Sequence, residues 1–66
     1  MRATINGTPR ELADGVTLGE LLAELGVPRV GVAVAVNETV VRGGSFDGVR
    51  LSDGDSVEII RAVAGG

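Results

Sequence analysis

Few residues in this 66-residue chain could do chemistry, and the clearest reactive group is the carboxylate of the last glycine, Gly66. The sequence contains no cysteine and no histidine, which excludes thiol nucleophiles, disulfides, thiolate or imidazole zinc sites and the usual proton shuttle. Asp53 and Asp55 flank a glycine, and we interpret this as turn chemistry rather than a metal-binding pair. Gly43-Gly44 lacks the phosphate-loop pattern and is interpreted as a loop. No catalytic residue, metal ligand or bound cofactor is predicted.

The Gly65-Gly66 end suits a site where a carboxylate is activated. A carboxylate is a poor electrophile because its charge is spread over two oxygens, whereas its mixed anhydride with AMP accepts sulfur or nitrogen nucleophiles. Glycine brings no side chain into a narrow channel and has a permissive backbone. Residues 63–66, extended at about 3.3–3.6 Å per residue, would reach on the order of 13 Å into a partner. We expect Gly66 to react, with Gly65 and Ala64 entering the partner's active site. The alternative is a chance end without function.

Composition narrows the classes of partner. The net charge is −3, all six basic residues are arginine, and there is one Phe with no Tyr or Trp. Nucleic-acid binding usually needs a basic patch and stacking aromatics, so nucleic acid is set aside. No apolar run approaches the roughly 20 residues of a membrane span, and no signal peptide is recognisable. Because small secreted domains usually depend on disulfides, we expect a cytoplasmic protein that binds no membrane.

The first half of the sequence predicts a hairpin and a helix. Asn6-Gly7 is a strong two-residue hairpin signal, and Pro9 makes the returning strand an edge strand. A helix is predicted over about 18–25, opened by a capping box of Thr17 and Glu20. Its leucines recur at helical spacing on one face, namely Leu18, Leu21, Leu22 and Leu25. Gly26 and Pro28 end this helix.

The second half predicts three strands. Residues 30–36 alternate valine with glycine or alanine, which indicates a half-buried strand with its valines toward the helix. Asn37-Glu38 turns the chain into a short strand over 39–41. Residues 42–50 are interpreted as a loop or single helical turn, with Phe46 filling the bottom of the core. The last strand, residues 56–63, places Val57 and Ile59 toward the core and Ile60 on the opposite face. These three side chains set the orientation of the strand that leads to the Gly-Gly end.

This order of elements limits the fold. A single helix must cover one face of a mixed sheet to bury its leucines. Placing the first and last strands side by side and parallel, with one hairpin outside each, gives an α+β β-grasp (ubiquitin-like) roll. We expect four to five strands, one main helix, and one domain over residues 1–66, with residues 63–66 as an extended tail.

Three stretches carry a family resemblance: "LADGVTLGELLAELG", "VAVAVNETVV" and "LSDGDSVEIIRAVAGG". Together they resemble the sulfur carriers of thiamine biosynthesis (the ThiS family), a ubiquitin-like family, over essentially the whole chain. The Asp-Gly-Asp turn, the "VEII" strand and Gly65-Gly66 are the most specific part. Where that family usually has Asn-Gly-Glu, this chain has Asn37-Glu38-Thr39, which leaves the turn type open.

The resemblance implies a carrier rather than an enzyme. A ubiquitin-activating-type adenylating enzyme would use ATP to convert the Gly66 carboxylate into an acyl-adenylate. A cysteine desulfurase or other sulfur-relay protein would then supply sulfur in place of one oxygen. Thiazole synthase would take this sulfur from the resulting thiocarboxylate into the thiazole ring of thiamine. The lack of cysteine agrees with sulfur carried on the terminus.

The surface next to the tail supplies candidate partner contacts. Ile60, Ala33 and Ala35 would form a modest apolar patch, and Arg61 would pair with a partner carboxylate. The alternatives are that Ile60 covers its neighbours and that Arg61 is solvated. Other functions also remain open at this point: a carrier for molybdopterin, cysteine or tRNA thiolation, a modifier of other proteins, or a passive β-grasp interaction module that would not need Gly66.

Overall fold

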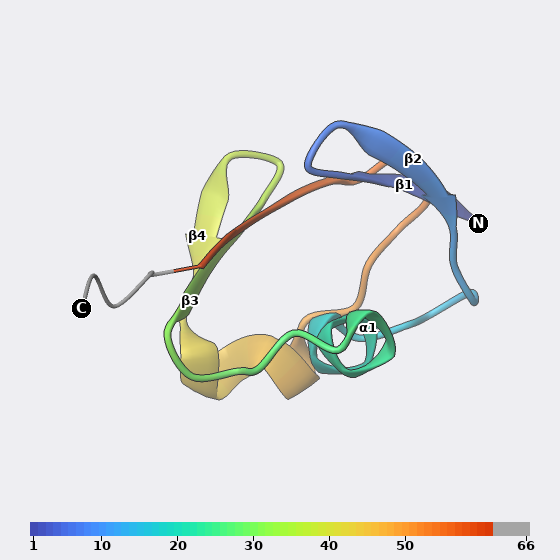
Figure 1. The fold of residues 1–66 in the computed structure, drawn as a ribbon. Helices are drawn as coiled ribbons and strands as arrows, with labels where there is room; N and C mark the ends of the chain where they lie inside the picture. The colour runs from blue at the N-terminus through green and yellow to red at the C-terminus, as the bar shows by residue number, and fades with distance from the viewer. Residues whose placement is uncertain (62–66) are drawn as a thin grey trace.

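The structure is a computed structural model that describes residues 1–61, and its elements follow the predicted order. In chain order these elements are β1 (Arg2–Ile5), β2 (Thr8–Glu11), α1 (Leu18–Leu25), β3 (Val32–Val36), β4 (Thr39–Val41), the 3-10 helix η1 (Gly43–Gly48) and β5 (Ser56–Arg61). Figure 1 shows a curved sheet with α1 and η1 on its concave side. The far side of the sheet, away from α1, is called the open face below.

The sheet has the topology that the sequence predicts. Its strand order is β2-β1-β5-β3-β4. The first and last strands are parallel neighbours, with Ile5 opposite Val57, and an antiparallel hairpin lies outside each. The strand with Pro9 is an edge strand, where a missing N–H costs no ladder hydrogen bond. This confirms the β-grasp arrangement, with five strands in the described residues.

Both hairpin turns use left-handed backbone. The φ angles are 51° at Asn6 and 82° at Gly7 in the first turn, and 50° at Asn37 and 71° at Glu38 in the second. Two consecutive positive φ angles are the mark of the two-residue turn that matches strand twist. Glu38 therefore adopts this left-handed backbone, which costs a residue with a Cβ about 1 kcal/mol. The turn type that the sequence left open is therefore a two-residue turn with left-handed backbone at Asn37 and Glu38.

The helix begins and ends where the sequence predicts. The Thr17 side chain accepts a hydrogen bond from the Glu20 backbone N–H at 3.1 Å, and the Glu20 carboxylate accepts one from the Thr17 N–H at 2.9 Å. Gly26 ends the helix at φ 70°, with its N–H directed to carbonyls of the last turn. The leucine stripe faces the sheet: Leu18, Leu21 and Leu22 are fully buried, and Leu25 is partly buried.

The core lies between the sheet and the two helices. Phe46 on η1 is fully buried, as predicted, and packs in one cluster with Val34 and Val57 from the middle of the sheet. The remaining buried members of this cluster are Ala3, Ile5, Leu12, Val16, Leu18, Leu21, Leu22 and Leu51. The strands thus contribute to the core through the face that points toward the helices.

The predicted start of the third strand is wrong. The strand begins at Val32 rather than at residue 30, because Gly31 has a φ of 78° and interrupts the extended backbone. Val30, expected to face the helix, is 88% exposed. The loop before β3 is attached to η1 instead, because the Arg29 guanidinium donates two hydrogen bonds to the Asp47 carboxylate at 2.8 and 2.7 Å. The predicted last strand, residues 56–63, is described as far as Arg61.

Candidate functional site

The predicted reactive end lies beyond the described residues. Gly66, Gly65 and Ala64 all fall outside residues 1–61. What the structure describes is the strand that leads to them, β5, and the surfaces that flank its last residues. The candidate site is therefore built from the end of β5 outward.

The candidate partner residues Ala33, Ala35 and Ile60 share one surface. Ala33 lies opposite Ile60 on β5, and Ala35 lies opposite Val40 on β4. All four side chains alternate with core-facing neighbours such as Val34, so they lie on the open face. Ile60 is 62% exposed and Val40 is 72% exposed. We call the four residues Ala33, Ala35, Val40 and Ile60 the open-face patch.

Val40 was not among the sequence-predicted site residues. The signal that would have found it is alternation: Val41 pairs with the buried Val34, so its neighbour Val40 must point to the open face. The small alanines on β3 leave the larger Val40 and Ile60 standing out on either side. The exposed Glu58 lies opposite Ala35 and adds a negative charge to the same face.

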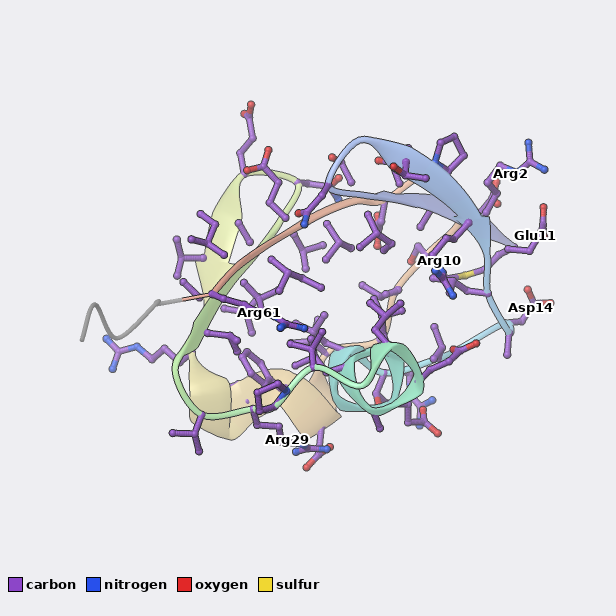
Figure 2. The ribbon with its side chains drawn as sticks, in the orientation of Figure 1. Arg2, Arg10, Glu11, Asp14, Arg29 and Arg61 are labelled. Atoms are coloured by element: carbon purple, nitrogen blue, oxygen red, sulfur yellow. The ribbon has the colours of Figure 1, made fainter. Side chains whose placement is uncertain are left out.

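Arg61 is separated from this patch. It lies opposite Val32, in the series of β5 residues whose side chains point toward α1. Figure 2 shows the Arg61 side chain on the helix side of the sheet. The two predicted contacts on β5, Ile60 and Arg61, therefore lie on opposite faces. A partner that touches both must surround the end of the strand.

Two turn asparagines hold β5 in place. The Asn6 carboxamide accepts a hydrogen bond from the Ile59 N–H at 2.8 Å and donates one to the Ile59 carbonyl at 3.2 Å. Asn37 accepts from the Ser56 N–H at 3.0 Å and donates to the Asp55 carboxylate at 3.0 Å. From sequence both residues signal only a turn. Their second role depends on how far β5 runs past each hairpin, which no local pattern records.

The two aspartates near the start of β5 behave as turn residues. The Asp53 carboxylate accepts a hydrogen bond from the Arg2 N–H at 2.7 Å, and the Asp55 carboxylate accepts one from the Ser52 N–H at 2.8 Å. Within residues 1–61, no group of three acidic side chains is placed to hold a metal ion. Nor does any helix in that range have the length and apolar character needed to cross a membrane.

Ionisable groups with a shifted pKa lie around α1 and at the N-terminus. Hydrogen bonds from the Arg29 guanidinium lower the pKa of the Asp47 carboxyl, and hydrogen bonds to the backbone and side chain of Thr17 lower that of Glu20. The hydrogen bond to Asp14 raises the pKa of the Met1 amino group. These contacts tie together the helix start and the loops, so the shifts report on structure.

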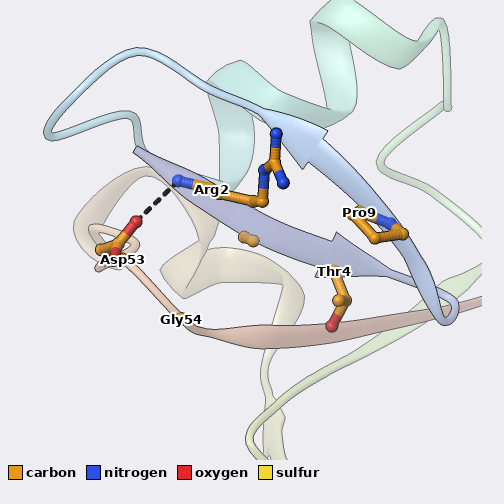
Figure 3. A pocket seen from close by; sticks show the side chains of 6 residues that line it. Arg2, Thr4, Pro9, Asp53 and Gly54 are labelled. Atoms are coloured by element: carbon orange, nitrogen blue, oxygen red, sulfur yellow. Dashed lines mark hydrogen bonds between the residues drawn. The ribbon is translucent and has the colours of Figure 1, made fainter.

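A shallow pocket of about 300 Å³ lies between β1, β2 and the loop before β5. It is lined by Arg2, Ala3, Thr4, Pro9, Asp53 and Gly54 (Figure 3). The hydrogen bond between Asp53 and the Arg2 backbone, drawn in Figure 3, closes one side of it. None of the sequence-predicted site residues lines this pocket.

The chain is similar to sulfur carrier proteins of the ThiS family and to part of a thiazole synthase. The sequence matches the ThiS family over residues 3–66. It is 45% identical over 62 residues to the sulfur carrier protein ThiS of Thermus thermophilus, an alignment that spans 94% of this chain and 95% of that protein. It is 39% identical over 66 residues to the thiazole synthase of Paramagnetospirillum magneticum, of which it spans only 20%. The crystal structure of the thiamine biosynthesis protein ThiS from Geobacter metallireducens superposes with a TM-score of 0.85 at 35% identity, over the whole of both chains.

Proposed function

The chain belongs to the ThiS family of sulfur carrier proteins, and from this premise we propose that it carries sulfur for thiamine biosynthesis on the carboxylate of Gly66. One observation carries the assignment of the residue: the family match extends to Gly66, and with it to both terminal glycines. The chain offers no thiol on which sulfur could be held instead. The protein is then a co-substrate for other enzymes.

The first step activates the carboxylate. An oxygen of the Gly66 carboxylate attacks the α-phosphorus of ATP in a partner adenylating enzyme, the bond between the α- and β-phosphates breaks, and pyrophosphate leaves. The product is a mixed anhydride with AMP, in which the carbonyl carbon is electrophilic. Glycine at this position and the one before it leaves the approach to that carbon unobstructed.

The second step introduces sulfur. A sulfur nucleophile supplied by a cysteine desulfurase or another sulfur-relay protein attacks the carbonyl carbon, a carbon–sulfur bond forms, and AMP leaves. With hydrosulfide as the nucleophile, the products are the thiocarboxylate, AMP and a proton. Thiazole synthase is the proposed acceptor. A segment similar to this whole chain forms part of the thiazole synthase of Paramagnetospirillum magneticum, which supports that pairing.

We assign partner binding to the surfaces on either side of the end of β5. The open-face patch offers apolar side chains that already face solvent, so covering them removes apolar area from water. Arg61, on the other side, offers a guanidinium suited to a partner carboxylate. The two sides have different chemistry, so apolar and charged substitutions test them separately.

Intact mass before and after incubation with the cognate adenylating enzyme, ATP and hydrosulfide tests this function. We expect a gain equal to the exchange of one oxygen for sulfur, located on the terminal residue by fragmentation. The matched control lacks Gly66 and should gain nothing. No gain in the full chain, with an enzyme proven active on another carrier, would contradict the proposal. Transfer to thiazole synthase, followed as return to the original mass, tests the pathway.

A further inference from the structure

Within residues 1–61, the last part of β5 has a neighbouring strand on only one side. On the β3 side, pairing continues to the end of the strand, where Val32 lies opposite Arg61. On the other side, the parallel pairing with β1 ends with Ile5 opposite Val57. Figure 1 shows β5 running on past the turn of the β1–β2 hairpin. In the part of the chain that the structure describes, the end of β5 at Arg61 therefore has one edge uncovered.

Hydrogen-bond alternation identifies the groups on that edge. Neighbouring residues of a strand direct their N–H and C=O groups to opposite sides. The Asp55 carbonyl accepts from the Thr4 N–H at 2.9 Å and the Val57 carbonyl from the Asn6 N–H at 2.8 Å, so odd-numbered residues face β1. Ser56 faces the other way, with its carbonyl accepting from Asn37 at 2.7 Å. Arg61 is the next residue after Ile59 in the series that faces β1.

Asn6 marks the point where pairing on this edge stops. Its carboxamide bonds both the N–H and the carbonyl of Ile59, which takes the place of a further β1 residue. The chain then turns away at Gly7, where an added Cβ would have no heavy atom within 4 Å. The Arg61 N–H and carbonyl thus point to the side of β5 on which no strand pairs with them in the described residues.

The sequence after this point favours recognition through the main chain. Residues 62–66 read Ala-Val-Ala-Gly-Gly and contain no charged or hydrogen-bonding side chain. A partner that must align this segment has backbone groups and one valine to bind. Addition of a strand to an exposed sheet edge supplies main-chain hydrogen bonds that fix direction and register.

The outer edges of the sheet suit such pairing less well. On β2, Pro9 lies opposite Thr4 and brings no N–H to the edge. On β4, a strand of three residues, only the Val40 backbone groups point outward. The two-residue turn makes Val36 and Thr39 a hydrogen-bonded pair, and such pairs alternate along an antiparallel ladder, so Val40 and Ala35 form a pair without hydrogen bonds. Neither outer edge continues into Gly66. The inner edge at Arg61 does, and it is flanked by Ile60 of the open-face patch.

We propose that an extended segment of the adenylating enzyme pairs as a strand with the free edge of β5 at Arg61, next to the Asn6 carboxamide, and so holds the chain for reaction at Gly66. The inference rests on the proposed function and adds the mode of partner recognition. The Arg61 N–H donates to a backbone carbonyl of the enzyme, and the Arg61 carbonyl accepts from a backbone N–H. The contribution of Arg61 through its backbone is separate from that of its guanidinium.

Two substitutions at one position separate these contributions. Arg61→Ala removes the guanidinium and keeps the N–H, whereas Arg61→Pro removes both. A residue before proline prefers extended backbone, which Ile60 already has, so the strand tolerates the change. The measurement is kcat/KM of the adenylating enzyme for each carrier, from pyrophosphate release. We expect Arg61→Pro to lie about tenfold below Arg61→Ala, the scale of one or two lost hydrogen bonds. A chemically synthesised chain with a backbone ester in place of the Arg61 N–H should show a similar loss.

Each other outcome has a definite meaning. Equal kcat/KM for Arg61→Pro and Arg61→Ala, together with an unaffected ester chain, would overturn strand pairing and leave the carrier function standing. A lower Tm for Arg61→Pro than for Arg61→Ala would also overturn it, because the N–H would then have a partner within the fold. If the wild-type chain supports no adenylation, the proposed function itself fails. Equal Tm with unequal kcat/KM is the expected result.

Discussion

Alternate residues of the same strands make the two faces of the sheet differ in burial. On the helix side, Val34 and Val57 are buried against Phe46. On the open side, Ala33 and Ala35 leave Ile60 largely exposed. Burial on one side supplies the stability, so the other side can keep apolar groups in water, where we propose that a partner binds. In a chain this small, a face available for binding is one that contributes little to the core.

The largest expected effect is the loss of stability when the helix side is opened. Phe46→Ala should lower the free energy of unfolding by about 3–5 kcal/mol, because it leaves a cavity under the sheet. Ile60→Ala, on the open face, should change it by less than about 0.5 kcal/mol. Urea denaturation followed by circular dichroism measures both. Similar losses in the two variants would erase the distinction between the faces.

The next effect should appear in partner binding and leave folding unchanged. Ile60→Asp places a charge in the open-face patch, and we expect about a tenfold lower kcat/KM with the adenylating enzyme, the scale of a removed apolar contact. The midpoint of thermal unfolding should match that of wild type. Glu58→Ala, on the same face, is the matched control for altered charge and should retain most activity. A normal rate for Ile60→Asp would remove Ile60 from the proposed interface.

A smaller effect is expected at a turn that belongs to neither face. Glu38→Gly should raise the free energy of unfolding by about 0.5–1 kcal/mol, because glycine adopts the φ of 71° seen there without steric cost. Gly7→Ala, in the other hairpin turn, places a side chain at a φ of 82° and should destabilise. A urea midpoint above that of wild type for Glu38→Gly and below it for Gly7→Ala would establish that both turns need left-handed backbone. A destabilising Glu38→Gly would contradict it.

The smallest effect is a loss of stability in acid on the helix side. The folded pKa of both Glu20 and Asp47 is lowered, so their contribution is present above their ordinary values of 4.5 and 3.8 and is lost as the pH falls through the folded values. The urea midpoint should decline below about pH 4.5. In a Glu20→Gln, Asp47→Asn double variant this decline should be weaker. Because all these carboxylates are exposed, we expect the change to be modest.

The sequence predicted the fold closely because its local signals agree with one another. The capping box at Thr17, the leucine spacing and Gly26 each set one feature of α1, and the structure keeps all three. The prediction that Val30 faces the helix was wrong, because alternation alone does not reveal that Gly31 has left-handed backbone or that Arg29 pairs with Asp47. That ion pair joins residues far apart in the chain, and no local pattern encodes it.

The candidate site was predictable in part. Alternation placed Ile60 on the open face, and it would have placed Val40 there too. The position of Arg61 on the helix side follows from the same rule, since it is two residues after Ile59. The hydrogen bonds between Asn6 and Ile59 could not be predicted from the sequence, because they depend on the offset between a hairpin turn and a strand more than fifty residues away.

The Asn6 contact also bears on the chemical lifetime of the protein. An asparagine followed by glycine is prone to deamidation, in which the Gly7 nitrogen attacks the side-chain carbonyl and ammonia is lost. In the fold, both ends of that carboxamide are bound to Ile59, which opposes the rotation that the attack requires. Once the carboxamide has become a carboxylate, it can no longer donate to the Ile59 carbonyl, and its negative charge faces that oxygen. In an aged sample, the strand that leads to Gly66 would therefore lose its contact with residue 6 before the core is disrupted.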